Sequence, residues 1–238
     1  MEQRFEFDGR SLTQLARVFA VSRPLSPKRR YDETEVPGRN GVLVSVDGFE
    51  SCEVEVDVML MASTSFEVED VRRRLSEALT GCVTGRLVLP GSCGVSHDAM
   101  FIGGVELARI EQYPTCKLKF LLTDPVGRGR SRRAALKTSA GTVEVAGTAE
   151  TWPVITATPG AQGHWTVANV TTGAFVRVEA AFSGGQKVVV DMGAMRCTVN
   201  GADHAVSIDS DFFPLAPGRN VLKVSSGTAS MAWDERWL

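Results

Sequence analysis

The sequence predicts a mainly β protein of two domains, the first of which contains one helix. Short apolar or alternating runs bounded by Gly, Pro or Asn recur along the chain, which is typical of strands. One segment, residues 65–81, has instead the i, i+3, i+7 apolar spacing of an amphipathic helix. With 43% hydrophobic and 23% charged residues, the composition is that of an ordinary globular protein rather than a disordered chain.

The N-terminal domain, which we place at residues 1–125, is expected to carry an exposed polar segment near its start. The stretch "RRYDETEVPGRNG" at residues 29–41 contains Pro37 and two glycines among polar residues. Gly and Pro in a polar run are typical of an extended excursion at the surface.

Two alternating runs follow, "GVLVSVDG" at residues 41–48 and "CEVEVDVML" at residues 52–60. In the second run acids alternate with valines, so one face is polar and the other apolar, as in a half-buried strand. The Asp47-Gly48 pair suits a tight turn. We therefore expect these two runs to pair as a hairpin.

The predicted helix spans "SFEVEDVRRRLSEALTG", residues 65–81. Thr64 or Ser65 can cap its N-terminus, acidic residues in its first turn suit the helix dipole, and Gly81 can end it. One apolar stripe runs along it, formed by Val68, Val71, Leu75, Ala78 and Leu79.

Further strands are expected at "GRLVLPG", residues 85–91, "AMFIGGVELARIEQ", residues 99–112, and "TCKLKFLLTDP", residues 115–125. In residues 126–140, Gly and Arg replace core residues, which predicts a linker. Its arginines could attract phosphate, but no aromatic residues are interleaved for stacking on bases, so a solvated hinge is favoured.

The C-terminal domain, residues 141–238, contains only short, regularly spaced apolar runs divided by Gly, Asn or Pro. This spacing predicts an all-β sandwich or barrel. Near its end, "DFFPLAPG" at residues 211–218 is expected to turn a corner between two late strands. Phe212, Phe213 and Leu215 would pack beneath that corner.

One stretch, "GSCGVSHD", brings possible catalytic residues close together in sequence. Ser92 or Cys93 could act as a nucleophile if His97 served as its base. The following segment has the pattern of a strand, whereas a nucleophile elbow leads into a helix. A polar loop is therefore the favoured interpretation, and we expect no enzyme.

No metal or cofactor site is expected. Cys82, Cys93, His97 and Cys116 supply suitable ligand atoms, but no C-x-x-C pair brings two of them together locally. The sequence also lacks the glycine-rich motifs that bind nucleotide phosphates. Five cysteines at irregular spacing favour free thiols over a disulfide framework.

Charge and hydropathy exclude two classes of partner. A net charge of −2 gives no electrostatic basis for binding nucleic acid or anionic lipid. No run approaches the ~18 apolar residues of a membrane helix, and "MEQRFEFDGR" lacks the pattern of a signal peptide. We therefore expect synthesis in a cytoplasm and no membrane partner.

Tryptophans offer a second functional hypothesis, a carbohydrate-binding module for cell-surface glycans. Trp152, Trp165, Trp233 and Trp237 could stack on sugar rings if they were exposed on one face of the sandwich. Burial in a core or an interface is the commoner fate of tryptophan.

Taken in order, these stretches resemble the distal tail proteins of phages with long, non-contractile tails. The resemblance is carried by "FDGRSL" at residues 7–12, "VPGRNG" at 36–41, "GRLVLPG" at 85–91 and "KLKFLLTDP" at 117–125. It ends with "GGQKVVVDM", "SDFFPLAPGRNVLKVSSGTA" and "ERWL" within residues 184–238, and so covers nearly the whole chain.

The resemblance implies an N-terminal ring-forming domain with one helix and a protruding hairpin or belt, and a C-terminal galectin-like β-sandwich. Here the belt would span about Arg30 to Asp47. Its candidate interface residues are Glu33, Glu35, Val36, Pro37, Arg39 and Asn40. The galectin likeness also implies a glycan site that loosely resembles the sugar-binding site of galectins. It would be made by His164, Trp165, Asn169 and Arg177.

The function implied is structural. Such proteins form a hexameric ring at the virion tail tip, made in the host cytoplasm, which joins the tail tube to the tail-tip hub. The implied partners are further copies of the chain, the tail tube protein, the hub or tail-associated lysin, and a receptor-binding protein. DNA would pass through the ring without being read in a sequence-specific way.

Overall fold

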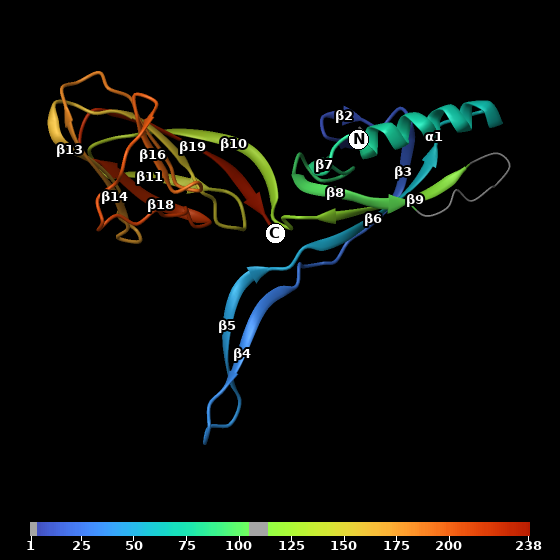
Figure 1. Cartoon of the computed structure of the whole chain (residues 1–238), viewed down its shortest axis with the longest axis horizontal. Helices are drawn as coiled ribbons and strands as arrows, with labels where there is room; N and C mark the ends of the chain where they lie inside the picture. Colours follow the sequence, from blue (N-terminus) through green and yellow to red (C-terminus); the bar gives the residue numbers. More distant parts are fainter. Residues whose placement is uncertain (1–3, 105–113) are drawn as a thin grey trace. The chain divides into compact units, whose positions relative to one another are not determined.

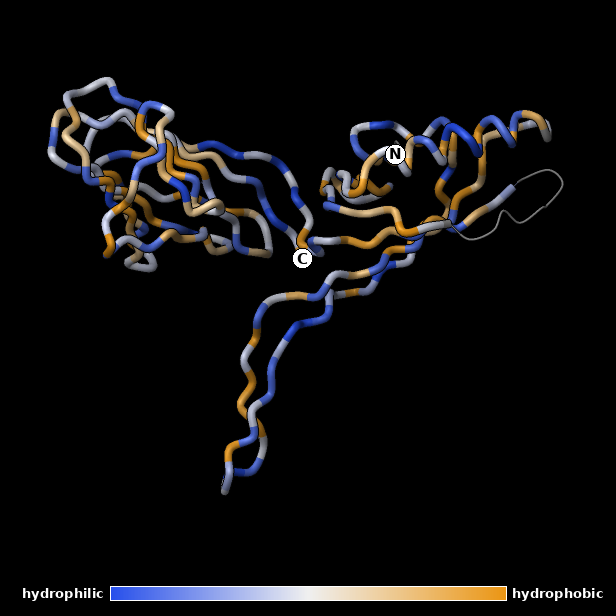
Figure 2. The backbone as a smooth tube through the Cα atoms, viewed as in Figure 1, coloured by the Kyte–Doolittle hydropathy of each residue, from blue (hydrophilic) through white to orange (hydrophobic). Residues whose placement is uncertain are grey.

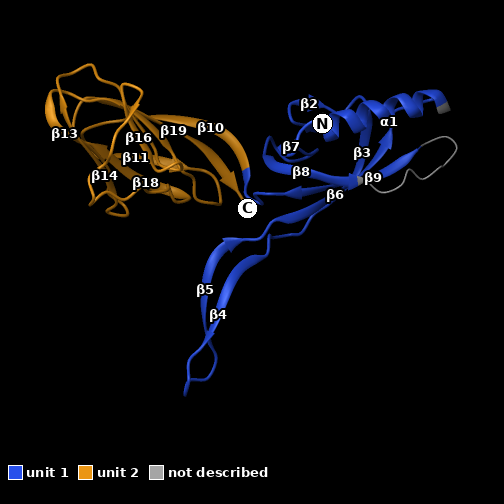
Figure 3. Cartoon of the chain, viewed as in Figure 1, with its two compact units in different colours: residues 1–127, 238 blue, residues 128–237 orange. Residues whose placement is uncertain are grey.

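The computed structural model describes residues 4–104 and 114–238, which divide into two compact units (Figures 1 and 3). Unit 1 comprises residues 1–127 with Leu238, and unit 2 comprises residues 128–237. Strands dominate both units, and α1 (Ser65–Thr80) is the one helix among the described residues. The predicted mainly β class is confirmed.

Apart from β4 and β5, the strands of unit 1 form one antiparallel sheet in the order β3-β6-β9-β8-β7-β1-β2. Their bounds are β1 (Glu6–Phe7), β2 (Arg10–Ser11), β3 (Ala16–Ser22), β6 (Cys52–Leu60), β7 (Gly85–Val88), β8 (Ser96–Gly104) and β9 (Thr115–Leu122). Part of the predicted strand at residues 99–112 lies outside the described residues.

Helix α1 shares the core of unit 1 with the apolar face of the sheet. The predicted stripe is buried or half-buried, and it meets the valines of β6 and the apolar residues of β9 in one cluster. Thr64 caps the helix: its hydroxyl accepts the Glu67 N–H at 3.3 Å, and the Glu67 carboxylate accepts the Thr64 N–H at 3.2 Å. The predicted helix and its cap are therefore confirmed.

The alternation of β6 is also confirmed, because its valines are fully buried and its acids lie on the other face. On that face two lysines of β9 contact one acid of β6. The Nζ atoms of Lys117 and Lys119 lie 2.8 and 2.7 Å from the carboxylate of Glu55. Hydrogen bonds from these two lysines lower the pKa of Glu55 to about 2.

The predicted pairing of residues 41–48 with residues 52–60 is wrong. Strand β5 (Val42–Phe49) pairs with β4 (Arg29–Glu35), whereas β6 pairs with β3 and β9. Gly48 has φ 117° and lies opposite Arg30, within a register shift of the hairpin rather than at a turn. Both segments of the hairpin are strands because their main-chain groups pair with each other, although neither buries its side chains.

Unit 2 is a sandwich of two antiparallel sheets, with the orders β17-β16-β15-β12-β19-β10 and β11-β18-β13-β14. The strands are β10 (Gly127–Leu136), β11 (Gly141–Val145), β12 (Val154–Thr158), β13 (Gln162–Asn169), β14 (Phe175–Phe182), β15 (Val188–Asp191), β16 (Arg196–Val199), β17 (Ala202–Asp203), β18 (Gly218–Val224) and β19 (Thr228–Trp237). Apolar residues of both sheets form one core.

The linker expected at residues 126–140 is mostly a strand, β10, which pairs with β19 inside unit 2. Its polar side chains contact β19 instead of solvent alone. The Arg132 Nε donates to the Glu235 carboxylate at 2.8 Å, and Ser131 hydrogen-bonds Asp234. The arginines misled the prediction because the side chains of this strand are mostly exposed or half-buried, and an exposed strand face tolerates charge as well as a hinge does.

Candidate interaction surface

The hairpin formed by β4 and β5 stands clear of the core of unit 1. Almost every side chain of both strands is exposed. At its root the Glu50 N–H donates to the Lys28 carbonyl at 2.8 Å, so pairing continues to the base. The strands hold each other through seven matched residue pairs and one register shift. The hairpin is therefore regular structure that lacks a covering layer.

The tip of the hairpin is a tight turn built by proline and glycine. The Arg39 N–H donates to the Val36 carbonyl at 3.1 Å across the turn. Pro37 supplies the fixed φ of its second residue, and Gly38, at φ 78°, supplies the left-handed third residue that a type II turn requires. The structure thus brings the six predicted belt residues together at the end of the hairpin, with Glu33 and Glu35 closing β4.

One face of the hairpin carries a row of apolar side chains from β5, with Tyr31 and the carboxylates of Glu33 and Glu35 opposite them on β4. Cross-strand partners lie on the same face of a ribbon, and Tyr31 pairs with Val46, Glu33 with Val44 and Glu35 with Val42. We call Tyr31, Val42, Val44 and Val46 the valine face. Each of the four is between 44% and 57% exposed, and Figure 2 shows the hydrophobic residues of β5 beside the more hydrophilic β4.

The exposed row of apolar residues makes this face the candidate interaction surface. An isolated two-stranded ribbon is marginal in water, and contiguous exposed apolar residues commonly mark interaction sites. The sequence-based interpretation missed this face because the alternation of "GVLVSV" was assigned to a core-facing strand. The alternating valines are visible in the sequence, but only the fold shows that no other strand or helix of the described chain covers them.

Ser92, Cys93 and His97 are not joined into a catalytic arrangement among the described residues. His97 lies in β8 and is buried, with 8% exposed, whereas Ser92 and Cys93 lie in the preceding loop. The Ser92 carbonyl accepts the Val95 N–H at 2.9 Å, and Cys93 Sγ contacts the Gly91 carbonyl at 3.6 Å. Among the described hydrogen bonds none joins His97 to either nucleophile.

His97 instead lines a cavity of about 330 Å³ in unit 1, together with Cys52. Burial lowers the pKa of His97 below its usual value, and the guanidinium of Arg23 lowers it further. The carboxylates of Asp124 and Asp98 act in the opposite direction but do not reverse the shift. His97 is therefore buried as a neutral imidazole near pH 7.

This burial predicts an acid sensitivity of unit 1. The unfolded chain binds a proton at His97 below pH about 6.5, whereas the folded chain resists it, so His97 costs stability as the pH falls through that value. We expect His97→Gln to remove this part of the pH dependence. Urea midpoints followed by circular dichroism at pH 7.5 and 5.5 should show a smaller fall for the variant. Equal falls would contradict the assignment.

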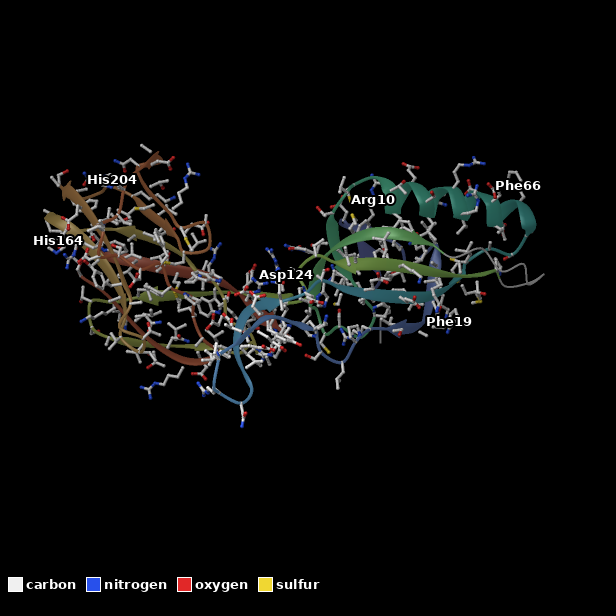
Figure 4. The ribbon with its side chains drawn as sticks, turned by 60° about the horizontal axis from the view of Figure 1, so that its bottom comes forward. Arg10, Phe19, Phe66, Asp124, His164 and His204 are labelled. Atoms are coloured by element: carbon white, nitrogen blue, oxygen red, sulfur yellow. The ribbon has the colours of Figure 1, made fainter. Side chains whose placement is uncertain are left out.

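The expected glycan residues do not form one accessible site. His164 is exposed on the surface of unit 2 (Figure 4), and Arg177 is half-exposed, with its guanidinium 3.6 Å from Asp209. Trp165 and Asn169 are both 0% exposed, because β13 turns them into the core while His164 points the other way. Neither buried side chain is accessible to a sugar.

Metal-binding side chains are not clustered either. In residues 4–104 and 114–238 no three His, Cys, Asp or Glu side chains are placed to hold an ion, and the five cysteines are free thiols. No helix in the described part of the chain is long and apolar enough to cross a membrane. The hairpin is therefore the candidate functional surface.

Comparison with known proteins gives matches of two kinds. Residues 146–237 match the model of the siphovirus-type tail component, C-terminal domain. No curated protein matches the sequence.

Solved structures are similar over the full length. The Dit protein of phage SPP1, described as a paradigm of the hub adsorption apparatus in phages that infect Gram-positive bacteria, has a TM-score of 0.86 at 17% identity, covering 100% of both chains. A chain of the phage P2 baseplate, activated with Ca, has a TM-score of 0.55 at 8% identity over 99% of this chain and 98% of that one. The same baseplate activated with Sr gives 0.52 at 8% identity over 98% of each chain.

The resemblance seen in the sequence is thereby confirmed: residues 146–237 match the model of the siphovirus-type tail component C-terminal domain, and the whole chain has the fold of the SPP1 Dit protein.

Proposed function

We propose that this protein is a structural component of a phage or prophage tail that assembles with copies of itself through the hairpin. The observation that carries the proposal is the valine face: four apolar side chains, each about half exposed, on a regular ribbon that nothing in the described chain covers. Burial of the exposed half of each side chain in a neighbouring copy would stabilise the assembly by about 1 kcal/mol per side chain.

The assembly is a ring, six-fold by the resemblance to distal tail proteins. A hairpin that contacts a different surface of its neighbour makes a heterologous contact, and such contacts close into a ring when the rotation allows it. The tail-component match in unit 2 and the full-length likeness to SPP1 Dit support a place at the tail tip. There the ring would join the tail tube to the hub or lysin, carry a receptor-binding protein and let DNA pass.

The test compares two neighbouring positions of β5 that lie on opposite faces of the ribbon. Val44→Asp places a charge on the valine face, whereas Ser45→Asp places the same charge on the other face. Both sites are exposed, so both variants should fold. We expect wild type and Ser45→Asp to have the mass of the ring in light scattering, and Val44→Asp to assemble at least about 10-fold more weakly, since a charge buried in an apolar contact is costly.

Negative-stain images of the wild type should show rings with a central hole. A monomer at every protein concentration would contradict the proposed self-assembly. Equal masses for all three proteins would show that the valine face is not the contact.

A further inference from the structure

The cavity that contains His97 lies at the root of the hairpin. Its lining includes Leu25 and Pro27, from the segment that enters β4, and Cys52 and Val54, which follow β5. The hairpin therefore has a tip at one end and a cavity at the other. Leu25 lies in the lining of this cavity and its side chain is fully exposed.

The cavity combines apolar walls with two unused polar groups. Val54, Leu89 and Leu122 form part of the walls. The Nδ1 atom of His97 is buried without a hydrogen-bond partner among the described residues. Arg23, also in the lining, forms no ion pair in the described part of the chain. Because buried polar atoms are nearly always paired in native proteins, Nδ1 is a hydrogen-bonding group that a molecule bound in the cavity could use.

The hairpin tip has the complementary chemistry. Val36 and Pro37 offer two compact apolar side chains, and Glu35 places a carboxylate directly before them. The turn also presents backbone carbonyls, which can accept a hydrogen bond from a neutral imidazole. A cavity of about 330 Å³ suits a few side chains rather than a whole strand.

A chain cannot fill its own cavity in this way. The two strands remain paired from the root to the tip, and the seven residues of β4, at ~3.4 Å each, separate the tip from the root by about 24 Å. A hairpin tip that fills the cavity must therefore come from a second copy of the chain.

We infer that the cavity at the root of the hairpin receives the hairpin tip of a neighbouring copy, with Val36 and Pro37 inside it and Glu35 beside Arg23. This inference rests on the proposed self-assembly and names the site that the hairpin tip would occupy. Each copy has one tip and one cavity, so the contact is heterologous and repeats around a ring.

The native thiol of Cys52 makes the contact testable by cross-linking. The variant Val36→Cys, in a Cys93→Ser background that removes the exposed thiol, should form a disulfide with Cys52 of the next copy upon mild oxidation. A disulfide requires Cα atoms about 4.4–6.8 Å apart, so it reports close contact. Non-reducing gels should show a ladder of covalent oligomers that disappears with reductant.

Two controls define the position of the cross-link. Adding Cys52→Ser should abolish the ladder, and Ser45→Cys in place of Val36→Cys should give none, because that residue lies in the middle of the strand. A ladder that survives Cys52→Ser would overturn the inference.

Charge reversal provides a second measurement at exposed positions that should not disturb folding. Arg23→Glu should weaken assembly about 10-fold in light scattering, and adding Glu35→Arg should restore it. If the wild type forms rings but shows neither the disulfide ladder nor the rescue by Glu35→Arg, the cavity is not the binding site of the tip and the proposed function stands. If the wild type never assembles, the proposed function and this inference both fail.

Discussion

Replacing Trp165 with alanine is expected to destabilise unit 2 by about 3–5 kcal/mol, the usual cost of deleting a large aromatic side chain from a packed core. Trp165 is 0% exposed and belongs to the cluster that joins the two sheets of the sandwich. Its indole N–H donates to the Ser226 carbonyl at 3.2 Å. That carbonyl lies at the corner between β18 and β19, where the chain crosses from one sheet to the other.

The conservative variant separates packing from hydrogen bonding. Trp165→Phe keeps much of the ring but leaves the Ser226 carbonyl without its indole donor, so we expect a smaller loss of about 1–3 kcal/mol. Trp152→Ala is the matched control, because Trp152 is 38% exposed and leaves less of a cavity when truncated. Its loss should be the smallest of the three.

Cys197 provides a readout specific to unit 2, because it is the one cysteine in residues 128–237. Burial raises the pKa of its thiol to about 11, so it reacts slowly until the unit unfolds. Urea-dependent alkylation followed by mass spectrometry should show Trp165→Ala reacting at a much lower urea concentration than wild type. Alkylation of both at the same urea concentration would contradict the core role. A loss of sugar binding in Trp165→Ala would report unfolding of unit 2 rather than the loss of an exposed ring on which a sugar stacks.

Features set by local residue patterns could be predicted from the sequence. The capping of α1 needs only Thr64 and Glu67 at the right spacing, and the burial of β6 follows from alternate valines. The corner at "DFFPLAPG" was also predicted: Phe213 and Leu215 are buried beneath it, and Phe212 is partly buried against the same core. In each case neighbouring residues supply the physical cause, so distant partners are not needed.

Strand pairing could not be predicted in the same way, because it depends on residues far apart in the chain. The alternation in "GVLVSV" is equally compatible with pairing to the next strand and with pairing to β4. The arginines of β10 hid a strand whose partner, β19, lies about a hundred residues later.

The candidate site was predicted only in part. The belt segment followed from the family resemblance, but the valine face and the root cavity require the register of the hairpin and the fold of unit 1. For Trp165, the alternation of "HWTVAN" already places it on the face of Val167 and Asn169. That pattern could have indicated burial, whereas the galectin likeness drew attention to an exposed platform.

The substitution Asn220→Asp is expected to cost about 3–5 kcal/mol of unit 2 stability, although it replaces only the side-chain NH2 group by an oxygen. Asn220 is 0% exposed, and its amide group donates to the Ala216 carbonyl at 2.8 Å and the Gly218 carbonyl at 3.2 Å. Its Oδ1 accepts the Ala216 N–H at 3.2 Å. An aspartate retains the acceptor but loses both donors, and each buried group left unpaired costs about 1–3 kcal/mol.

The pH dependence of this variant should identify the cause. A buried carboxylate facing two carbonyl oxygens favours its protonated form, so the pKa in the folded state exceeds that in the unfolded state. The folded variant then binds more protons than the unfolded chain, and its stability relative to wild type should rise as the pH falls toward that higher pKa. Asn40→Asp, at the exposed hairpin tip, is the matched control and should change little.

The size of the effect follows from the position of Asn220 in the sandwich. It lies in β18, which pairs with β11 on one side and β13 on the other, so the corner fixes where one of the two central strands of that sheet begins. Pro214 and Pro217 restrict the corner, and the Asn220 amide donates to the Ala216 and Gly218 carbonyls there. If alkylation of Cys197 in Asn220→Asp requires as much urea as in wild type, the corner is held by its prolines and packing alone.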